Sequence, residues 1–356
     1  MKKILFLALL LIFSCKSDKS EKIKTSETKN SEAKEFSSVE IENIFEDDSL
    51  SIRAIEIIGN NLAFAANKGT FGLYNSKTGE MKTGLISDGD YIPEFRAVAS
   101  TNSDVFVLSV GSPALLYKTG DSGQMELVYR ENHEKAFYDS MIFWNDQEGI
   151  AMGDPTDNCL SVIITRDGGE SWKKLDCNIL PEVAEGEAAF AASNSNIAVK
   201  GDKTWIISGG KKSRVFFSPD KGESWEVFET PLIQGKETTG GYSIDFYDEN
   251  NGIIIGGDYT NPDDNSANKA ITSDGGKTWK LVGEGQEPGY KSSVRYVPNN
   301  NGKYILATGF TGISYSKDGG KTWDQLSDEN FFTIRFVNDS TAYAAGKGRI
   351  SKLDFK

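Results

Sequence analysis

A short motif that occurs four times constrains the fold of this chain more than any other feature of the sequence. Each copy reads Ser/Thr-x-Asp-x-Gly-x-Ser/Thr-Trp, where x is any residue, and the copies occupy residues 165–172, 218–225, 272–279 and 316–323. Their aspartates are 53, 54 and 44 residues apart. A repeat of about 40–50 residues that contains a tight turn is the size of one four-stranded blade of a β-propeller. The sequence therefore predicts an all-β protein built from repeated blades.

Each residue type in the motif has a physical role in a turn between two strands. The Asp carboxylate accepts hydrogen bonds from backbone N–H groups of the turn, and the Gly adopts a positive φ without steric cost. The Trp side chain has a large apolar surface, which we expect to pack between neighbouring blades. The motif is therefore predicted to stabilise the fold rather than to carry chemistry.

Alignment of the chain on these motifs predicts seven repeats. The inner strand of each repeat is expected to begin near Ser51, Glu94, Phe137, Glu187, Tyr242, Ser292 and Phe332. The last repeat reaches Lys356 after only three strands, and the alternating segment 39–45 is able to supply its fourth strand. This arrangement predicts one seven-bladed β-propeller over residues 39–356, closed into a ring by an N-terminal strand, which leaves no open sheet edge.

The motif resembles the Asp box, also called the BNR repeat, of sialidase-like β-propellers. Three further segments, residues 149–155, 186–193 and 256–259, are similar to bacterial relatives of the photosystem II stability/assembly factor family. The resemblance to that family extends over essentially the whole mature chain. It implies a propeller in which the boxes lie on outer turns, away from the axis, and it implies a role in binding or assembly.

The first residues resemble the signal peptide of a bacterial lipoprotein. Lys2 and Lys3 precede an apolar run over residues 4–13, which is too short to span a membrane and ends at Ser14-Cys15. We predict a signal peptide over residues 1–15, lipidation of Cys15 and a flexible tether over residues 16–38, which is rich in Lys, Ser, Glu and Thr. The protein is then a membrane-anchored lipoprotein of the bacterial cell envelope, periplasmic or surface-exposed, that contacts the membrane only through its lipid. The alternative is an ordinary signal peptide with a coincidental cysteine.

Composition excludes several classes of function. The chain has 39 Lys and Arg against 52 Asp and Glu, a net charge of −13, so it lacks the clustered positive charge of a nucleic-acid-binding protein. A single histidine and three cysteines, without a CxxC or HExxH motif, give none of the usual zinc sites. We predict no metal and no cofactor, and we expect a monomer.

Two cysteines are placed to form a disulfide. Cys159 and Cys177 flank a predicted hairpin whose turn is centred on Gly168, which brings them opposite each other on neighbouring strands. Export from the cytoplasm favours oxidation. The alternative is a pair of neighbouring thiols.

Four arginines define a candidate ligand site. Of the eight arginines in the chain, Arg53, Arg96, Arg295 and Arg335 align near the starts of the predicted inner strands, on one face of the ring. Because the guanidinium group binds carboxylate and phosphate in a forked geometry, this alignment predicts an anion-binding cluster. The alternative is that these side chains fill the central channel and donate hydrogen bonds to backbone carbonyls.

Five titratable residues on the same face are candidates for catalysis. Asp139 and Glu187 lie at inner-strand starts, Asp154 and Asp258 lie at loops between second and third strands, and His133 precedes the third repeat. Tyr259, next to Asp258, is a further candidate for ligand binding. For each carboxylate, the alternative role is a loop cap or an ion pair.

These features support two hypotheses on function. The first is a binding or assembly module that holds an anionic ligand or a protein segment on its Arg- and carboxylate-lined face. The alternative is a glycoside hydrolase or lyase that acts on acidic glycans. The sequence contains no complete catalytic motif, and propellers serve both classes of function, so the first hypothesis is favoured on the resemblance.

Overall fold

The computed structural model describes residues 35–120 and 123–356. All regular secondary structure in these residues is β-strand. The predicted signal peptide, Cys15 and tether residues 16–34 lie outside the described residues. In the described part of the chain, no helix has the length and apolar character needed to cross a membrane.

The strands form six antiparallel sheets. The largest sheet has the order β27 (Thr333–Phe336), β28 (Thr341–Ala345), β29 (Lys347–Phe355), β1 (Val39–Ile58), β2 (Asn61–Ala66), β3 (Thr70–Asn75) and β4 (Met81–Leu85). Two four-stranded sheets follow in the chain, namely β5 (Phe95–Ser100), β6 (Val105–Ser109), β7 (Ala114–Thr119) and β8 (Met125–Glu131), and then β9 (Tyr138–Phe143), β10 (Gly149–Gly153), β11 (Ser161–Thr165) and β12 (Lys173–Lys174).

The remaining three sheets come from the second half of the chain. One contains β14 (Ile197–Lys200), β15 (Lys203–Ile207), β17 (Arg214–Ser218) and β18 (Glu226–Glu229). The next has the order β13 (Glu187–Ala188), β16 (Gly209–Gly210), β19 (Thr239–Phe246), β20 (Gly252–Asp258), β21 (Lys269–Thr272) and β22 (Lys280–Leu281). The last contains β23 (Ser293–Tyr296), β24 (Ile305–Gly309), β25 (Gly312–Ser316) and β26 (Asp324–Ser327).

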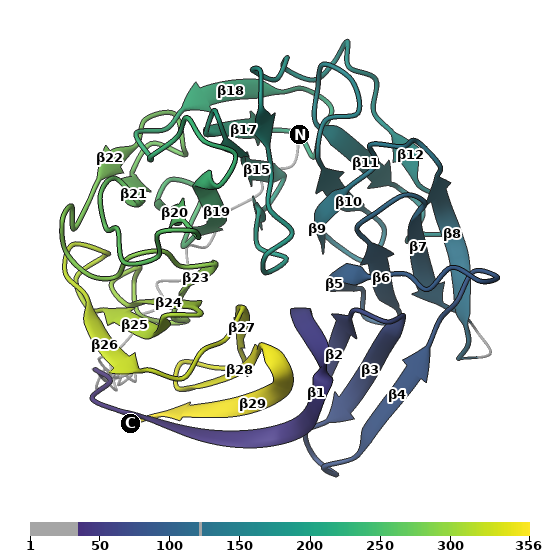
Figure 1. Ribbon diagram of the computed structural model, residues 1–356, viewed down its shortest axis with the longest axis horizontal. Helices are drawn as coiled ribbons and strands as arrows, with labels where there is room; N and C mark the ends of the chain where they lie inside the picture. The colour runs from purple at the N-terminus through teal and green to yellow at the C-terminus, as the bar shows by residue number, and fades with distance from the viewer. Residues whose placement is uncertain (1–34, 121–122) are drawn as a thin grey trace, which may run out of the picture. The chain divides into compact units, whose positions relative to one another are not determined.

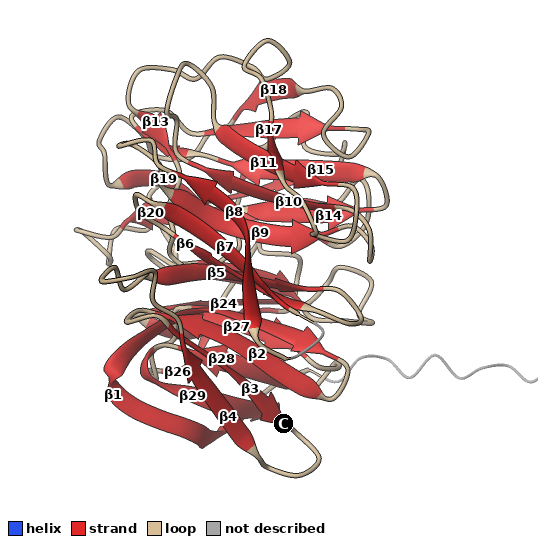
Figure 2. Ribbon diagram, turned by 90° about the vertical axis from the view of Figure 1, so that its right-hand side faces the viewer, coloured by secondary structure: helices blue, strands red, loops and turns tan. Residues whose placement is uncertain are grey.

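The sheets are arranged around a common centre. The inner strands contact one another in the cyclic order β1, β5, β9, β14, β19, β23 and β27, and β27 contacts β1. In Figure 1 these strands surround the centre and strands such as β4, β8, β18 and β26 lie at the rim, while Figure 2 shows the loops gathered at two opposite faces. The predicted all-β propeller is confirmed.

One long strand links the two ends of the chain. The first part of β1 pairs with β29, from Val39 opposite Phe355 to Glu46 opposite Arg349, and its last part pairs with β2. The count of seven blades and the closure of the ring stay predictions, and this pairing is the observation that favours them. Phe36 also belongs to the folded part, because its ring stacks on that of Phe355 with 4.7 Å between centroids. The folded part therefore extends into the predicted tether.

The four sequence motifs form closely similar hydrogen-bonded turns. In the first copy, Asp167 Oδ1 accepts a hydrogen bond from the backbone N–H of Ser171 at 3.0 Å, and Asp167 Oδ2 accepts one from the Ser171 hydroxyl at 2.6 Å. The motif Gly169 has a φ of 85°, and a Cβ atom there would lie 2.2 Å from the ring of Phe106 in the preceding sheet. Glycine is required at this position both for the backbone angle and for the close approach.

The tryptophans of the motifs pack into the apolar clusters between neighbouring sheets. Trp279 lies between the sheet of β15 and that of β20, where its ring packs edge-on against Phe246 with 6.0 Å between centroids. Its indole N–H donates a hydrogen bond to the Gly276 carbonyl at 2.9 Å. The equivalent Trp323 makes the same bond to Gly320 but is more exposed. The motif thus joins a turn to the interface between blades.

Replacement of Trp279 by alanine is expected to lower the free energy of unfolding by about 3–5 kcal/mol, because it opens a cavity between two sheets. Trp323→Ala is the matched control and is expected to cost less, since its ring is only partly buried. Chemical denaturation of both variants measures the difference. Equal losses, or a loss below about 0.5 kcal/mol for Trp279→Ala, would show that the interface does not depend on this ring.

A segment inserted ahead of β14 occupies the centre of the described structure. The sequence alignment placed an inner strand at Glu187, but residues 187–188 form the short strand β13, which pairs with β16, and the inner strand is β14 at Ile197–Lys200. Residues 189–196, which we call the central plug, lie between them. The chain is rich in small and polar residues here (Ala-Phe-Ala-Ala-Ser-Asn-Ser-Asn) and forms no strand.

The central plug is held by hydrogen bonds from almost every inner strand. Asn194 is its main anchor: the side-chain Oδ1 accepts a hydrogen bond from Met141 N–H at 2.9 Å, and Nδ2 donates to the Val98 carbonyl at 2.7 Å. Thr333 Oγ1 donates to the Ser193 carbonyl, and Ile244 N–H donates to the Ser195 carbonyl. A buried segment outside any sheet needs such partners for its backbone, and here the surrounding strands supply them.

Loss of the Asn194 side chain is expected to destabilise the protein by about 2–4 kcal/mol, because the Met141 N–H and the Val98 carbonyl lose a buried partner. Asn194 has a φ of 53°, so Asn194→Gly, which tolerates that angle, isolates the loss of the two hydrogen bonds from backbone strain. Thermal or chemical unfolding measures the effect, with Asn330→Ala at an exposed position as the control. Unchanged stability of Asn194→Gly would contradict an anchoring role.

Candidate functional site

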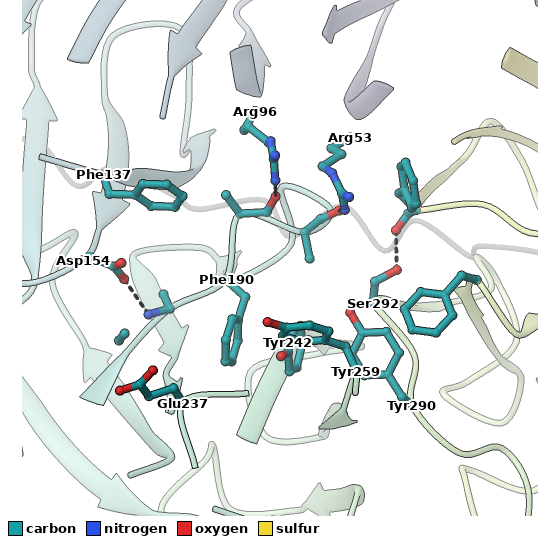
Figure 3. A pocket seen from close by; sticks show the side chains of 16 residues that line it. Arg53, Arg96, Phe137, Asp154, Phe190, Glu237, Tyr242, Tyr259, Tyr290 and Ser292 are labelled. Carbon is teal, nitrogen blue, oxygen red and sulfur yellow. Dashed lines mark hydrogen bonds between the residues drawn. The ribbon is translucent and has the colours of Figure 1, made fainter. Parts of the chain in front are cut away.

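A cavity of about 420 Å³ opens on the face where the inner strands begin, directly over the central plug. Figure 3 shows that its lining comes from many parts of the chain. The lining residues are Arg53, Arg96, Phe137, Asp154, Ala188, Ala189, Phe190, Ala191, Ala192, Glu237, Tyr242, Tyr259, Tyr290, Ser292, Phe310 and Phe332. Plug residues 189–192 are among them and form the floor of the cavity.

Aromatic rings make up most of the cavity wall. Phe190 of the plug stacks on Tyr242 with 3.8 Å between centroids and an angle of 2° between the ring planes. Tyr290 packs edge-on against Tyr242 and stacks on Phe310. Tyr259 and Phe310 are 46% and 40% exposed, which is unusual for such large side chains, and they lie at the mouth. The wall is therefore apolar and is open to solvent at one edge.

Four inner strands each contain a β-bulge near their start, and each bulge changes the direction in which one side chain points. The ladder between each of these strands and its neighbour skips one residue, which leaves Arg53 in β1, Arg96 in β5, Asp139 in β9 and Tyr242 in β19 without a register partner. A bulge twists the strand and re-aims the extra side chain, and bulges are common next to binding sites. Three of these residues line the cavity, and the fourth, Asp139, is fully buried behind it.

Arg53 lies at the edge of the cavity between the plug and an aromatic ring. Its Nη1 donates a hydrogen bond to the Ala192 carbonyl at 3.3 Å, and its guanidinium carbon is 4.0 Å from the centre of the Phe332 ring. Its Nε is buried without a hydrogen-bond partner. Burial, together with the nearby charge of Arg96, lowers the pKa of Arg53 to about 10. The group stays charged at neutral pH.

Arg96 is held in place by a carboxylate and by the plug. Its Nε and Nη2 donate to Glu94 Oε1 at 2.8 and 2.5 Å, and its Nη1 donates to the Ala191 carbonyl at 3.0 Å. Figure 3 shows both cavity arginines pointing toward the plug carbonyls. The alternative role stated for the arginines, donation to backbone carbonyls in the channel, thus applies to part of each side chain.

The other two predicted arginines lie below the cavity and do not line it, which corrects the expected cluster of four. Arg295 pairs with Leu306 and Arg335 with Tyr343 in regular register, so the bulges shift Arg53 and Arg96 out of line with them. Arg335 donates to the Asn194 carbonyl at 2.8 Å and to Glu56 at 3.4 Å. Arg295 lies 3.7 Å from Asp245. Both side chains thus contact groups of the chain itself, and a role for them in ligand binding stays a prediction.

Two carboxyl groups lie side by side next to the plug. Asp154 lines the cavity and accepts a hydrogen bond from Ala189 N–H at 2.7 Å, while Asp139 is fully buried and neither of its oxygens has a hydrogen-bond partner. Burial raises the pKa of Asp154 to about 6. Burial and the proximity of Asp154 raise the pKa of Asp139 well above its usual range, against the opposing effect of Arg96. Burial and the neighbouring carboxyl group therefore both favour the neutral form of Asp139.

The raised pKa of Asp154 predicts a stability that depends on pH. The folded state binds this proton more tightly than the unfolded state, so the contribution is complete below about pH 4 and is lost as the pH rises through about 6. Asp154→Asn keeps an acceptor for Ala189 and removes the charge. The variant is expected to be more stable than wild type by up to about 3 kcal/mol at pH 7.5 and to lose this advantage near pH 4.

Denaturant unfolding of both proteins across this pH range tests the expectation. Asp264→Asn is the control, because the pKa of Asp264 is lowered by hydrogen bonds from Ser266, so neutralising that group is expected to bring no stabilisation at pH 7.5. A stability difference between Asp154→Asn and wild type that does not change with pH would contradict the prediction.

Glu187 and Asp258 are each held by other groups of the chain. Glu187 is buried in an ion pair with Arg214 and also accepts a hydrogen bond from Ser208. Asp258 is buried and lies 3.3 Å from Lys236; burial acts to raise its pKa, but hydrogen bonds from Thr260 and its neighbours outweigh it and hold the pKa at about 2. Only Asp154, of the five candidates, lines the aromatic cavity.

A second cavity, of about 710 Å³, contains the remaining predicted residues. It is lined by exposed His133 and by Cys159 and Cys177, which form a disulfide with 5.5 Å between their Cα atoms. The disulfide joins the loop after Asp154 to the segment that leads into β13. Each of these two segments adjoins the aromatic cavity at one end, so the disulfide links two parts of the chain that contribute to the cavity. Among the described residues, no group of three or more His, Cys, Asp or Glu side chains is placed to bind a metal ion.

Sequence reasoning missed most of the aromatic wall. Tyr259 was the only aromatic residue among the predicted ligand-binding residues, yet six further rings line the cavity. The signal was present in the repeat alignment: Phe137, Tyr290 and Phe332 each come just before an inner strand. Phe190 carried no such signal, because it belongs to the inserted plug.

Comparison with known proteins shows that solved structures have a fold similar to that of this chain. No family model matches the sequence, and no curated protein matches it. The structure described as YCF48 bound to D1 peptide superimposes with a TM-score of 0.66 at 12% identity, covering 91% of this chain and 97% of that one. YCF48 from Cyanidioschyzon merolae superimposes with a TM-score of 0.64 at 12% identity, covering 88% and 98%. YCF48 is a photosystem II assembly factor with a β-propeller fold, so the likeness in fold expected from the sequence is confirmed.

Proposed function

We propose that this protein is a binding module for a protein segment, of the kind used in assembly, and that the segment docks in the aromatic cavity. The observation that carries the proposal is the cavity itself: about 420 Å³, walled by seven aromatic side chains, with two arginines at one side and two exposed rings at the mouth. Binding sites commonly combine such an apolar wall with a few fixed polar groups.

The cavity has the features of a site that recognises an extended segment. An apolar side chain of the partner would be buried against Tyr242, Tyr290 and Phe310, and exposed aromatic residues are the side chains that most often dominate the energy of protein recognition. Arg53 and Arg96 supply N–H donors beside this wall for a backbone carbonyl or a carboxylate of the partner. The solved structure of YCF48 with a D1 peptide supports this class of ligand for the fold.

The geometry gives less support to cleavage of acidic glycans. That alternative needs an acid and a base facing one substrate. Of the predicted candidates, Asp139 is fully buried, Glu187 is held by Arg214, and His133 lies at the second cavity. We therefore propose binding without catalysis.

The anchor at Cys15 and the location in the bacterial cell envelope are also part of the proposal, and they rest on the sequence of residues 1–15. In the described part of the chain, β1 begins at Val39, which pairs with Phe355.

Replacement of Phe310 or Tyr259 by alanine is expected to weaken binding of a protein segment about 10- to 100-fold, because each removes an exposed ring from the mouth of the cavity. The probe is a random dodecapeptide library displayed on phage and selected on the full chain. Synthetic copies of the enriched peptides are then titrated by fluorescence anisotropy against wild type and both variants.

Val337→Ala is the control, since Val337 is an equally exposed apolar residue in the turn between β27 and β28, on the opposite face. It is expected to leave the affinity unchanged. A selection that enriches no peptide, or enriched peptides that bind the Phe310 and Tyr259 variants as tightly as wild type, would overturn the proposed function.

A further inference from the structure

The structure also specifies the charge of the partner. We infer that the face around the aromatic cavity is an acidic and apolar docking surface that selects a basic, amphipathic protein segment. This inference rests on the proposed function and deepens it, because it states which segments the cavity accepts. It differs from the anionic ligand that the aligned arginines had led us to expect.

The loops of this face carry many more acidic than basic residues. Because neighbouring strands are antiparallel, the segments that lead into inner strands and the loops between second and third strands gather on one face. Together they contain 16 Asp and Glu, six Lys and no Arg. These segments are residues 67–69, 86–94, 110–113, 132–137, 154–160, 175–186, 208–213, 230–238, 259–268, 282–292, 310–311 and 328–332.

Most of these carboxylates are free to act on a partner. Twelve of the 16 acidic residues are exposed. Asp90, Glu237, Asp263 and Asp328 are exposed and take part in no hydrogen bond or ion pair of the described structure, and Glu237 lines the cavity itself. One of the six lysines, Lys291, is buried and donates to the Gly312 carbonyl. The negative charge at the surface is therefore largely uncompensated.

The positive charge inside the cavity is compensated. Glu94 binds Arg96 through two nitrogens, and the carboxyl group of Asp154 lies on the same wall. Arg53 donates to the plug. Both arginines are only partly exposed, whereas most of the loop carboxylates are exposed, so a polyanion approaching this face meets mainly negative charge. Electrostatic complementarity between surfaces governs the rate of encounter and the choice of partner.

The same face carries most of the exposed apolar side chains. In the described part of the chain, seven large hydrophobic residues are exposed; five of them lie on this face, and the other two lie on β8 and on the opposite face. The five are Leu85, Ile92, Ile179, Tyr259 and Phe310. Several stand beside carboxylates in the chain, such as Ile92 between Asp90 and Glu94. Alternating apolar and acidic groups complement a segment that presents apolar and basic side chains together.

The experiment uses the peptides enriched on the full chain from the random dodecapeptide library. The enriched pool is expected to contain more Lys and Arg than the unselected pool and to keep its aromatic and aliphatic residues. For the tightest binder, a second peptide with every Lys and Arg replaced by Glu is expected to bind at least about tenfold more weakly. The difference is expected to shrink between about 50 and 500 mM NaCl, because salt screens exposed charges.

A matched pair of variants locates the effect on the protein. The first carries Asp90→Asn, Glu237→Gln, Asp263→Asn and Asp328→Asn, and it is expected to bind the basic peptide at least about tenfold more weakly at low salt. The control carries Glu223→Gln, Glu226→Gln, Asp324→Asn and Asp339→Asn, an equal change in net charge at exposed positions away from the cavity face. It is expected to bind like wild type.

Each outcome decides between the two proposals. Enriched peptides that are neutral or acidic, or a glutamate peptide that binds as tightly as its basic parent, would overturn the inference and leave the proposed function standing. Equal weakening by the two sets of substitutions would also overturn it, because net charge alone would then account for binding. A library that yields no binder would overturn the proposed function, and this inference would fall with it.

Discussion

The hydrogen bonds that hold residues 189–196 at the centre of the molecule are the interaction on which the rest of the structure depends. A channel surrounded by inner strands is open unless something fills it, and here the filling is eight residues of the chain itself. Because these residues form no sheet, their carbonyls need donors, and four different strands supply them through Arg53, Arg96, Arg335, Thr333 and Ile244. The plug thereby couples sheets that are far apart in the sequence, and its upper surface is the floor of the aromatic cavity.

The features of the fold that sequence predicted are those that arise from local and repeated interactions. The turn of each motif is closed by hydrogen bonds within five residues, as between Asp167 and Ser171, so its geometry follows from the motif alone. Alternation and spacing then place six of the seven inner strands close to where they were expected. The error at Glu187 has the opposite origin. The insertion of the plug is stabilised by contacts with residues about 50 to 140 positions away, such as Met141 and Thr333, and no local pattern encodes such contacts.

The candidate site was predicted only in part because its side chains are aimed by bulges. Repeat alignment treats Arg53, Arg96, Arg295 and Arg335 as equivalent, but a single extra residue in β1 and β5 moves the first two to the cavity and leaves the others beneath the plug. One residue reverses the side of the strand to which a side chain points. Part of the aromatic wall could have been predicted from the sequence, since Phe137, Tyr290 and Phe332 lie within three residues of the start of an inner strand. The effect of Asp154 on the pKa of Asp139 could not be predicted from the sequence, because it depends on burial.

The plug also changes the electrostatic character of the site. Arginines aligned on a repeat indicate a positive face only if their charges remain available. Here Arg335 lies under the plug, Arg96 is bound to Glu94, and both cavity arginines give a donor to plug carbonyls. What remains exposed around the cavity is the charge of the loops, which is negative, and the apolar surface of Tyr259, Phe310 and their neighbours. Hydrogen bonds within the fold thus use part of the donor capacity of both cavity arginines, and most of the exposed charge of this face lies on the loops, where substitutions change the surface without disturbing the plug.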